Sequence, residues 1–247
     1  MIITKYHGCK YEVDIGEHIG GCFYFFSEYE PLFESCLSSL LKEKNPNYFL
    51  DIGANIGTYT VWSAKYVNHV YAFEPSPTIR ERLNKNIELN HLNNVTVVDK
   101  AVSDTNGESC FFTNLRPDNM GVGKIFRAGY EREEELKIVV ETITLDSFFE
   151  KYVMEGVGVI KIDVEGAELK VIEGGVDVLS KDKAPTLLIE VHPQELEMLG
   201  DSQVALVKTL ETYKYTVHDI SDHTKISAVS LNSDYYSKHF SIICTKE

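Results

Sequence analysis

The sequence predicts an α/β fold: a doubly wound, mainly parallel sheet of seven strands, with an antiparallel pair at its C-terminal edge and a small β-rich N-terminal extension. Between residues 48 and 213, short β-branched and aromatic runs alternate with segments whose apolar residues recur at helical spacing. After residue 213, two strand-like segments have no helical pattern between them. The length of 247 residues suits one such domain at 29–247, preceded by the extension at 1–28.

The individual elements follow from local patterns. In the extension, the β-leaning runs YHGCKYEVDI and CFYFF suggest a hairpin or two. The expected strands of the domain are YFLDIG, HVYAFEP, NVTVVDKAVS, VGVIKIDV, TLLIEVH, TVHDI and FSIICTK. The expected helices span 34–42, 58–67, 77–90 and 194–213, with a further one after VGVIKIDV in which Leu169, Ile172, Val176 and Leu179 face inward.

One polar segment interrupts this alternation. The strand-like runs CFFTN and LKIVVETITL flank residues 117–135, which are polar and contain glycine. We interpret this stretch as a loop or lid on the α/β frame. Together with Tyr29 and Glu30, its residues Asn119 and Met120 are expected to cover the cleft and contact a substrate.

Composition excludes some classes of partner. The formal charge of −14 and the pI of about 5.0 disfavour binding to nucleic acid or to an anionic membrane surface. Five dispersed cysteines without a CxxC pair indicate reduced thiols rather than a disulfide framework or a zinc site. The N-terminus lacks a signal peptide and no apolar run is long enough to cross a bilayer, so we expect a cytoplasmic protein of undetermined oligomeric state.

The turn after the first domain strand is the most informative segment. In FLDIGANIGT, Gly53 and Gly57 follow a buried strand and open a helix, where a glycine lets the backbone turn sharply and approach a ligand. The N–H groups of the helix N-terminus could receive a carboxylate. Taken alone, such a turn could also serve a nicotinamide or flavin cofactor, or have a structural role only.

Two acidic residues narrow the choice. Asp51 precedes the first glycine, where it would repel a pyrophosphate but attract an α-ammonium group. Asn55 occupies the position of the middle glycine in a dinucleotide-binding turn. Glu74 ends the next strand, about 20 residues further on, where a carboxylate can accept hydrogen bonds from two ribose hydroxyls. The alternative for Glu74 is a solvated strand-end carboxylate.

With these motifs in order, the sequence resembles the FkbM-type methyltransferases, a class I family that uses S-adenosylmethionine. The resemblance covers roughly residues 28–192 and rests on DIGANIGTYT, YAFEPSP, DKAVSD, TLDSF, IKIDVEGAELKVIEGG and LLIEVHP. It implies that the methionine end of the cofactor is held by Asp51, Gly53, Asn55 and Gly57. It also implies that the ribose is held by Glu74 beside Pro75 and Ser76, and that the adenine is edged by Asp99, Lys100 and Ala101. The implied reaction is O-methylation of a small molecule's hydroxyl, often on a sugar or natural product.

Four residues at neighbouring strand ends are candidates for catalysis. Asp163 and Glu165 lie two apart at the end of the fourth strand, and Glu190 and His192 lie two apart at the end of the fifth. An alcohol is a poor nucleophile, so its proton must pass to a base or its pKa must be lowered by a metal. The alternative for Asp163 or Glu165 is a helix cap, which we consider the main role of Glu168.

A metal-free site, with His192 as the base, is preferred over a Mg²⁺ or Mn²⁺ site. The reason is that no second histidine or close acidic pair strengthens the candidate ligand set of Asp163, Glu190 and His192. Two other functions stay open. A catalytically silent cofactor-binding or scaffold protein would keep the fold without turnover, and an NAD-dependent oxidoreductase is disfavoured by Asp51 and by the missing second glycine.

Overall fold

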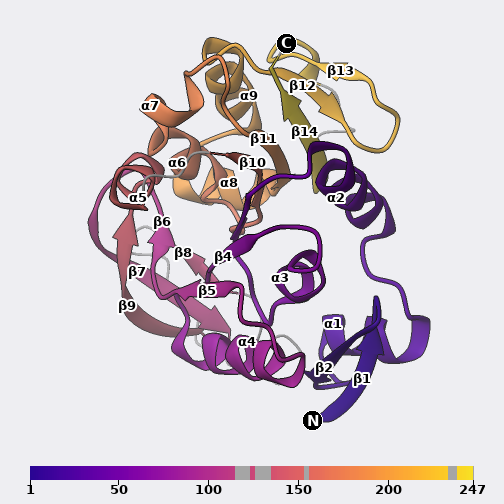
Figure 1. Ribbon diagram of the computed structural model, residues 1–247. Helices are drawn as coiled ribbons and strands as arrows, with labels where there is room; N and C mark the ends of the chain where they lie inside the picture. The colour runs from indigo at the N-terminus through magenta and orange to yellow at the C-terminus, as the bar shows by residue number, and fades with distance from the viewer. Residues whose placement is uncertain (115–122, 126–134, 153–155, 233–237, 247) are drawn as a thin grey trace.

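The structure, a computed structural model, describes residues 1–114, 123–125, 135–152, 156–232 and 238–246 (Figure 1). Its main sheet has eight strands in the order β13-β12-β14-β11-β10-β3-β4-β5. In that order they are Lys225–Ile226, Thr216–Asp219, Phe240–Thr245, Thr186–Val191, Val157–Ile162, Tyr48–Ile52, His69–Phe73 and Val95–Val98.

The direction of these strands confirms the doubly wound arrangement. The five strands from β11 to β5 are parallel, whereas β14 runs antiparallel to both β11 and β12. The expected antiparallel pair is therefore β12 and β14, and the two-residue β13 adds an eighth strand outside it. The strand order reverses between β3 and β10, and ligands of such sheets bind at the carboxyl ends beside that point.

Helices cover both faces of the sheet (Figure 1). One face packs against α2 (Pro31–Lys44), α3 (Thr58–Ser63) and α4 (Pro77–Leu89), in a core that includes Phe49 and Val159. Alternate residues on the same strands, Leu50 and Ile160, belong to the core of the opposite face. The helices of that face are α5 (Leu145–Tyr152), α6 (Glu168–Glu173), α7 (Val176–Leu179), α8 (Pro193–Leu199) and α9 (Gln203–Thr212).

The N-terminal segment confirms one expectation and corrects another. Strands β1 (Ile2–Tyr6) and β2 (Cys9–Val13) form the expected hairpin. The run CFYFF, expected as a strand, is instead a π-helical turn, η1 (Cys22–Phe26), that continues α1 (His18–Gly21). Only Phe23 of this turn is buried, with its ring stacked 4.1 Å from that of Tyr6, while the three aromatic residues after it are exposed. Consecutive aromatics carry no periodicity, so the run itself did not distinguish strand from helix.

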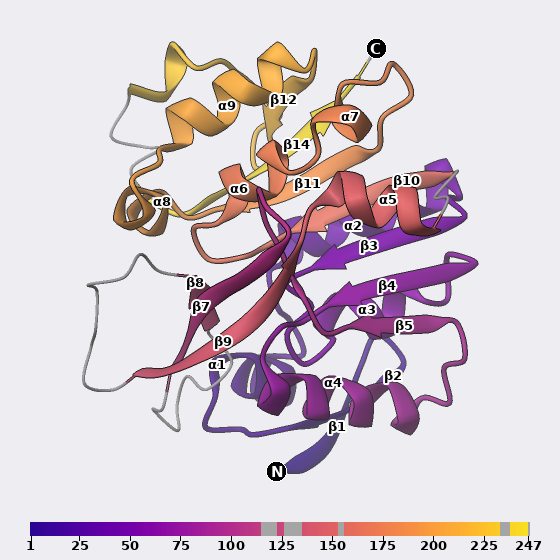
Figure 2. The ribbon, with the colours of Figure 1, turned by 90° about the vertical axis from the view of Figure 1, so that its left-hand side faces the viewer.

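A second, four-stranded sheet stands beside the main sheet (Figure 2). Its order is β6-β9-β7-β8, formed by Ala101–Val102, Glu135–Ile143, Gly107–Asn114 and Gly123–Ile125. The expected third strand, NVTVVDKAVS, is thus divided between β5 in the main sheet and β6 in this one. Within the expected lid, β8 is described, whereas Asn119 and Met120 lie outside the described residues.

Two further expectations need correction. The helix expected over 194–213 is two helices, α8 and α9, because Gly200 ends the first with φ of 85° and Ser202 caps the second by accepting the Ala205 N–H. Val176, expected to face inward, is 45% exposed at the start of α7. Within the part of the chain described here, no helix is long and apolar enough to cross a bilayer.

Candidate functional site

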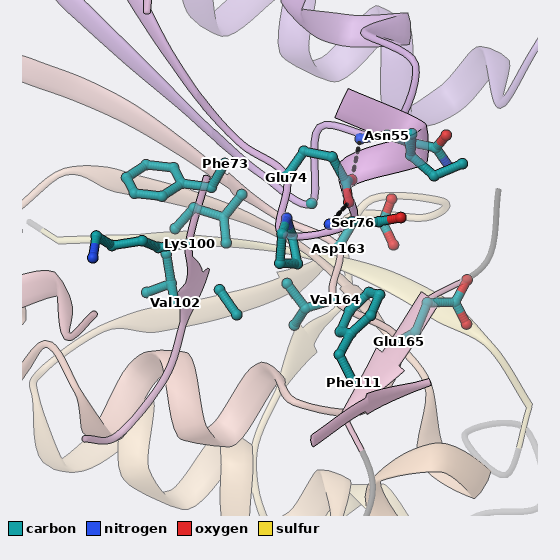
Figure 3. Close-up of a pocket in the computed structure, with 15 residues that line it drawn as sticks. Asn55, Phe73, Glu74, Ser76, Lys100, Val102, Phe111, Asp163, Val164 and Glu165 are labelled. Carbon is teal, nitrogen blue, oxygen red and sulfur yellow. Dashed lines mark hydrogen bonds between the residues drawn. The ribbon is translucent and has the colours of Figure 1, made fainter. Parts of the chain in front are cut away.

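A hollow opens where the ends of β3, β4 and β10 meet the second sheet (Figure 3). From the sequence-predicted set it is lined by Gly53, Asn55, Glu74, Pro75, Ser76, Lys100 and Ala101, and also by Asp163 and Glu165. We call it the cofactor hollow. Most of the predicted cofactor residues therefore gather around one space, although they come from three separate segments of the chain.

Glu74 is the fixed polar group of this hollow. Its carboxylate accepts the Asn55 N–H at 3.0 Å and the Ser76 N–H at 2.9 Å, so both oxygens are held in place (Figure 3). The side chain is 7% exposed, and burial raises its pKa from 4.5 to about 7 against the opposing effect of these hydrogen bonds. The structure excludes the alternative of a solvated strand-end carboxylate.

The two glycines serve close packing of the protein itself. Gly53 has φ of +82°, and a Cβ there would lie 1.7 Å from the backbone oxygen of Asp163. Gly57 has φ of +90°, and its Cβ would lie 2.6 Å from Leu83 of α4. The positive φ angles confirm the expected sharp turn, and both glycines also let the turn pack against β10 and α4. Close approach to a ligand stays a prediction, for which Gly53 is placed because it lines the hollow.

Asp51 does not reach the surface of the hollow. It is fully buried, accepts a hydrogen bond from Thr60 at 2.6 Å, and lies 3.1 Å from the Nζ of Lys161, its neighbour in register on β10. Burial alone would lower the pKa of Lys161, but Asp51 and Asp163 raise it, so the lysine is charged. Asp51 was expected to attract the α-ammonium group of the cofactor, but in the structure its charge is paired with that of Lys161. Lys161 was not singled out from the sequence.

Much of the remaining lining of the cofactor hollow is apolar. Phe73, Val102 and Phe111 line it, together with Ile52, Ile79 and Val164 (Figure 3). None of these was predicted, because apolar residues near strand ends look like ordinary core in a sequence. Asp99 is exposed and does not line the hollow, and Lys100, which does, pairs with Glu141.

A second hollow of about 270 Å³ adjoins the first. We call it the acceptor hollow. It is lined by all four predicted catalytic residues and by Tyr29 and Glu30, together with the unpredicted Glu17, His18, Ile19 and His239. Asn55, Asp163 and Glu165 line both hollows, so the two spaces share a boundary.

His192 is held by a buried carboxylate. Its Nδ1 lies 3.1 Å from the fully buried Glu168, and its Nε2 points toward Glu165 at 3.9 Å and Glu190 at 4.0 Å. Burial would lower the pKa of His192, but the hydrogen bond to Glu168 and the nearby Glu165 and Asp163 raise it to about 10. These carboxylates favour the charged form of the ring, and the expected role of His192 as base stays a prediction. Glu168, expected as a helix cap, orients this ring.

The acceptor hollow also contains the second histidine that the sequence did not reveal. His239, just before β14, lies 2.5 Å from the carboxylate of Glu190, and its ring stacks on that of His192 with centroids 4.8 Å apart. Glu165 and Asp163 supply a close acidic pair beside them. Both reasons for preferring a metal-free site are therefore removed.

Comparison with known proteins identifies the family. Residues 51–217, more than half of the chain, match the model of the methyltransferase FkbM domain. The chain belongs to the FkbM methyltransferase family. The match begins at Asp51 in β3 and ends in β12, so it contains the whole lining of the cofactor hollow. Of the acceptor hollow it contains the four predicted catalytic residues and Asn55, whereas the N-terminal lining residues and His239 lie outside it.

The chain is also similar to named methyltransferases. The chain is 29% identical over 154 residues to the hexuronic acid methyltransferase AglP of Haloferax volcanii, which covers 62% of this chain and 59% of AglP. It is 28% identical over 170 residues to the 2-O-methyltransferase NoeI of Sinorhizobium fredii, covering 64% and 68%. A solved structure from Staphylococcus aureus, provisionally named a caffeoyl-CoA O-methyltransferase, superposes with a TM-score of 0.50 at 13% identity, covering 88% of this chain and 85% of that one. The fold is that of the class I methyltransferases.

Proposed function

We propose that this protein is an S-adenosylmethionine-dependent methyltransferase that methylates a hydroxyl group of a sugar-like or natural-product-like small molecule. Membership of the FkbM family supports methyl transfer. The observation that carries the proposal is the shared boundary of the two hollows at Asn55, Asp163 and Glu165. A cofactor in one hollow would present its methyl group to an acceptor in the other, and such alignment is the main contribution that a protein makes to this reaction.

The residues of the cofactor hollow fit S-adenosylmethionine. The buried Glu74 offers carboxylate oxygens to the ribose hydroxyls, and Phe73, Val102 and Phe111 offer an apolar wall to the adenine. The methionine end would lie at the turn that contains Gly53 and Asn55. Asn55 also lines the acceptor hollow, so this end of the cofactor would face the acceptor. When bound, the cofactor supplies an electrophilic methyl group on its sulfonium.

Asp163 is the residue that we assign to accept the proton of the acceptor hydroxyl. Its side chain lines both hollows, and its Oδ2 lies 3.3 Å from the Nζ of Lys161, which fixes the carboxylate in place. A carboxylate at the shared boundary of the two hollows is the group placed to take up this proton.

The charge of the acceptor hollow bears on the acceptor. Its lining includes the carboxylates of Glu30, Glu165 and Glu190, besides those of Glu17 and Asp163, which pair with Arg82 and Lys161. Such a lining repels anions, so we propose an uncharged polyhydroxylated acceptor. The name of AglP, a hexuronic acid methyltransferase, supports a sugar-like acceptor. The name of NoeI, a 2-O-methyltransferase, supports transfer to oxygen.

Methyl transfer from labelled S-adenosylmethionine to a panel of neutral sugars, hexuronates and polyols tests the proposal. We expect O-methylation of neutral sugars at a higher kcat/KM than of the matching hexuronates. Asp163→Asn should lower kcat by roughly 10²–10⁴, the usual contribution of a positioned base. Transfer to amines but to no hydroxyl would contradict the proposed reaction, and a preference for hexuronates would contradict the assignment of the acceptor's charge.

A further inference from the structure

We propose that Glu190, His192 and His239 form a binding site for one divalent transition-metal ion in the acceptor hollow. The three residues come from the end of β11 and from the start of β14, which are neighbours in the sheet. Their nearest donor atoms lie within 4.8 Å of one another. Donors this close can bind one ion with bonds of about 2.1 Å after small side-chain movements.

The donor types also favour a metal. Two imidazoles and a carboxylate suit Zn²⁺, Mn²⁺ or Fe²⁺ better than Mg²⁺, which prefers oxygen ligands alone. Three protein ligands leave coordination positions open for water or for an acceptor hydroxyl. Glu165 lies 3.9 Å from the Nε2 of His192 and is placed to act as a fourth ligand.

The surroundings of His192 match those of metal-binding histidines. Such a histidine almost always donates its second ring N–H to a carboxylate or carbonyl, which fixes the ring and its tautomer. In this chain the Nδ1 of His192 faces Glu168, which is fully buried, and its Nε2 faces the hollow. A buried carboxylate behind the ring is thus an observation independent of the ligand cluster itself.

The site lies where a metal would act on methyl transfer. Glu190, His192 and His239 line the acceptor hollow, and Asp163, at its boundary with the cofactor hollow, lies beside them. A divalent ion here would orient an acceptor hydroxyl and lower its pKa, so that Asp163 takes up its proton more readily. This role rests on the proposed function, whereas the binding of the ion does not.

Titration of the EDTA-treated full-length protein with MnCl₂, without cofactor, tests the site. Free Mn²⁺ is followed by its electron paramagnetic resonance signal, and Mn²⁺ is chosen because it binds thiols such as Cys22 poorly. We expect one tightly bound ion per chain. His239→Asn, at a half-exposed position, should weaken binding by more than tenfold. Glu168→Gln should weaken it by about 10–100-fold, as for other partners of ligating histidines. His91→Asn, at an exposed position outside both hollows, is the matched control and should change nothing.

Two results would overturn the metal site. One is weak, non-stoichiometric binding, as the net charge of −14 alone would produce. The other is binding that His239→Asn leaves unchanged. Methyl transfer measured separately in EDTA distinguishes the two proposals. Activity without bound metal contradicts the role of the metal in methyl transfer, and metal binding without any methyl transfer contradicts the proposed function only.

Discussion

Substitution of Glu74 by glutamine should change how the stability of the protein depends on pH. Burial raises the pKa of Glu74 from 4.5 to about 7, so the folded protein holds a proton that the unfolded chain releases. The stabilising contribution of this group is complete below pH 4.5 and is lost as the pH rises through 7. The rise in pKa corresponds to about 3 kcal/mol in all.

The magnitude can be isolated by comparing two proteins. Glu74→Gln removes the titrating group but keeps its shape, and the hydrogen bond lost from Asn55 or Ser76 affects the variant at every pH. Between pH 5 and pH 8, the free energy of unfolding of the wild type should therefore fall by roughly 2.5 kcal/mol relative to that of the variant. Urea denaturation at pH 5, 6.5 and 8 measures this difference, and Glu81→Gln, at an exposed position of α4, is the control. Parallel pH profiles for wild type and Glu74→Gln would refute the reasoning.

The same carboxylate should link cofactor binding to pH. Ribose hydroxyls donate hydrogen bonds most strongly to the ionised form, so binding must first remove the proton from Glu74. The affinity of the wild type for S-adenosylhomocysteine should therefore rise between pH 6 and pH 8, while that of Glu74→Gln stays level. An affinity that falls over this range in the wild type would contradict the assigned contact.

Three other substitutions test separate parts of the account. Lys161→Met leaves Asp51 buried without its partner and should lower the free energy of unfolding by about 3–5 kcal/mol in urea denaturation. Adding Asp51→Asn to that variant should restore part of the loss, and an equal loss in the double variant would exclude the ion pair as the cause. Gly53→Ala should lower stability by more than the roughly 1–2 kcal/mol that a left-handed backbone costs a residue with a side chain, because its Cβ would meet the Asp163 carbonyl. Gly21→Ala, where the nearest atom lies 3.4 Å away, should fold normally, and similar melting temperatures for the two variants would contradict the packing argument. Asp163→Asn should lower kcat far more than it lowers affinity for S-adenosylhomocysteine, and equal losses by kinetics and calorimetry would assign it to cofactor binding.

The fold was largely predictable because its signals are periodic. Parallel strands buried on both faces and helices with one apolar face carry their pattern locally, as the alternation of Phe49 and Leu50 between the two cores illustrates. The failures lie where the pattern is absent. The aromatic run at 22–26 has no period, and the break in the helix over 194–213 depends on the single residue Gly200.

The candidate site was predictable only where residues follow strands directly. Glu74, Asp163, Glu190 and His192 follow from their positions at strand ends. His239 does not, because it reaches the site only through the pairing of β14 with β11, from nearly fifty residues further along the chain. The charge states were equally hidden, since they depend on partners such as Glu168 that the fold supplies.

Isothermal titration calorimetry with S-adenosylhomocysteine at pH 8 tests the central claim, that Glu74 anchors this cofactor at the end of β4. The wild type and Glu81→Gln should each bind one molecule per chain. Glu74→Gln should bind roughly 10–150-fold more weakly, the loss expected for hydrogen bonds to a charged group. No binding by the wild type, or equal affinity in wild type and Glu74→Gln, would contradict the account.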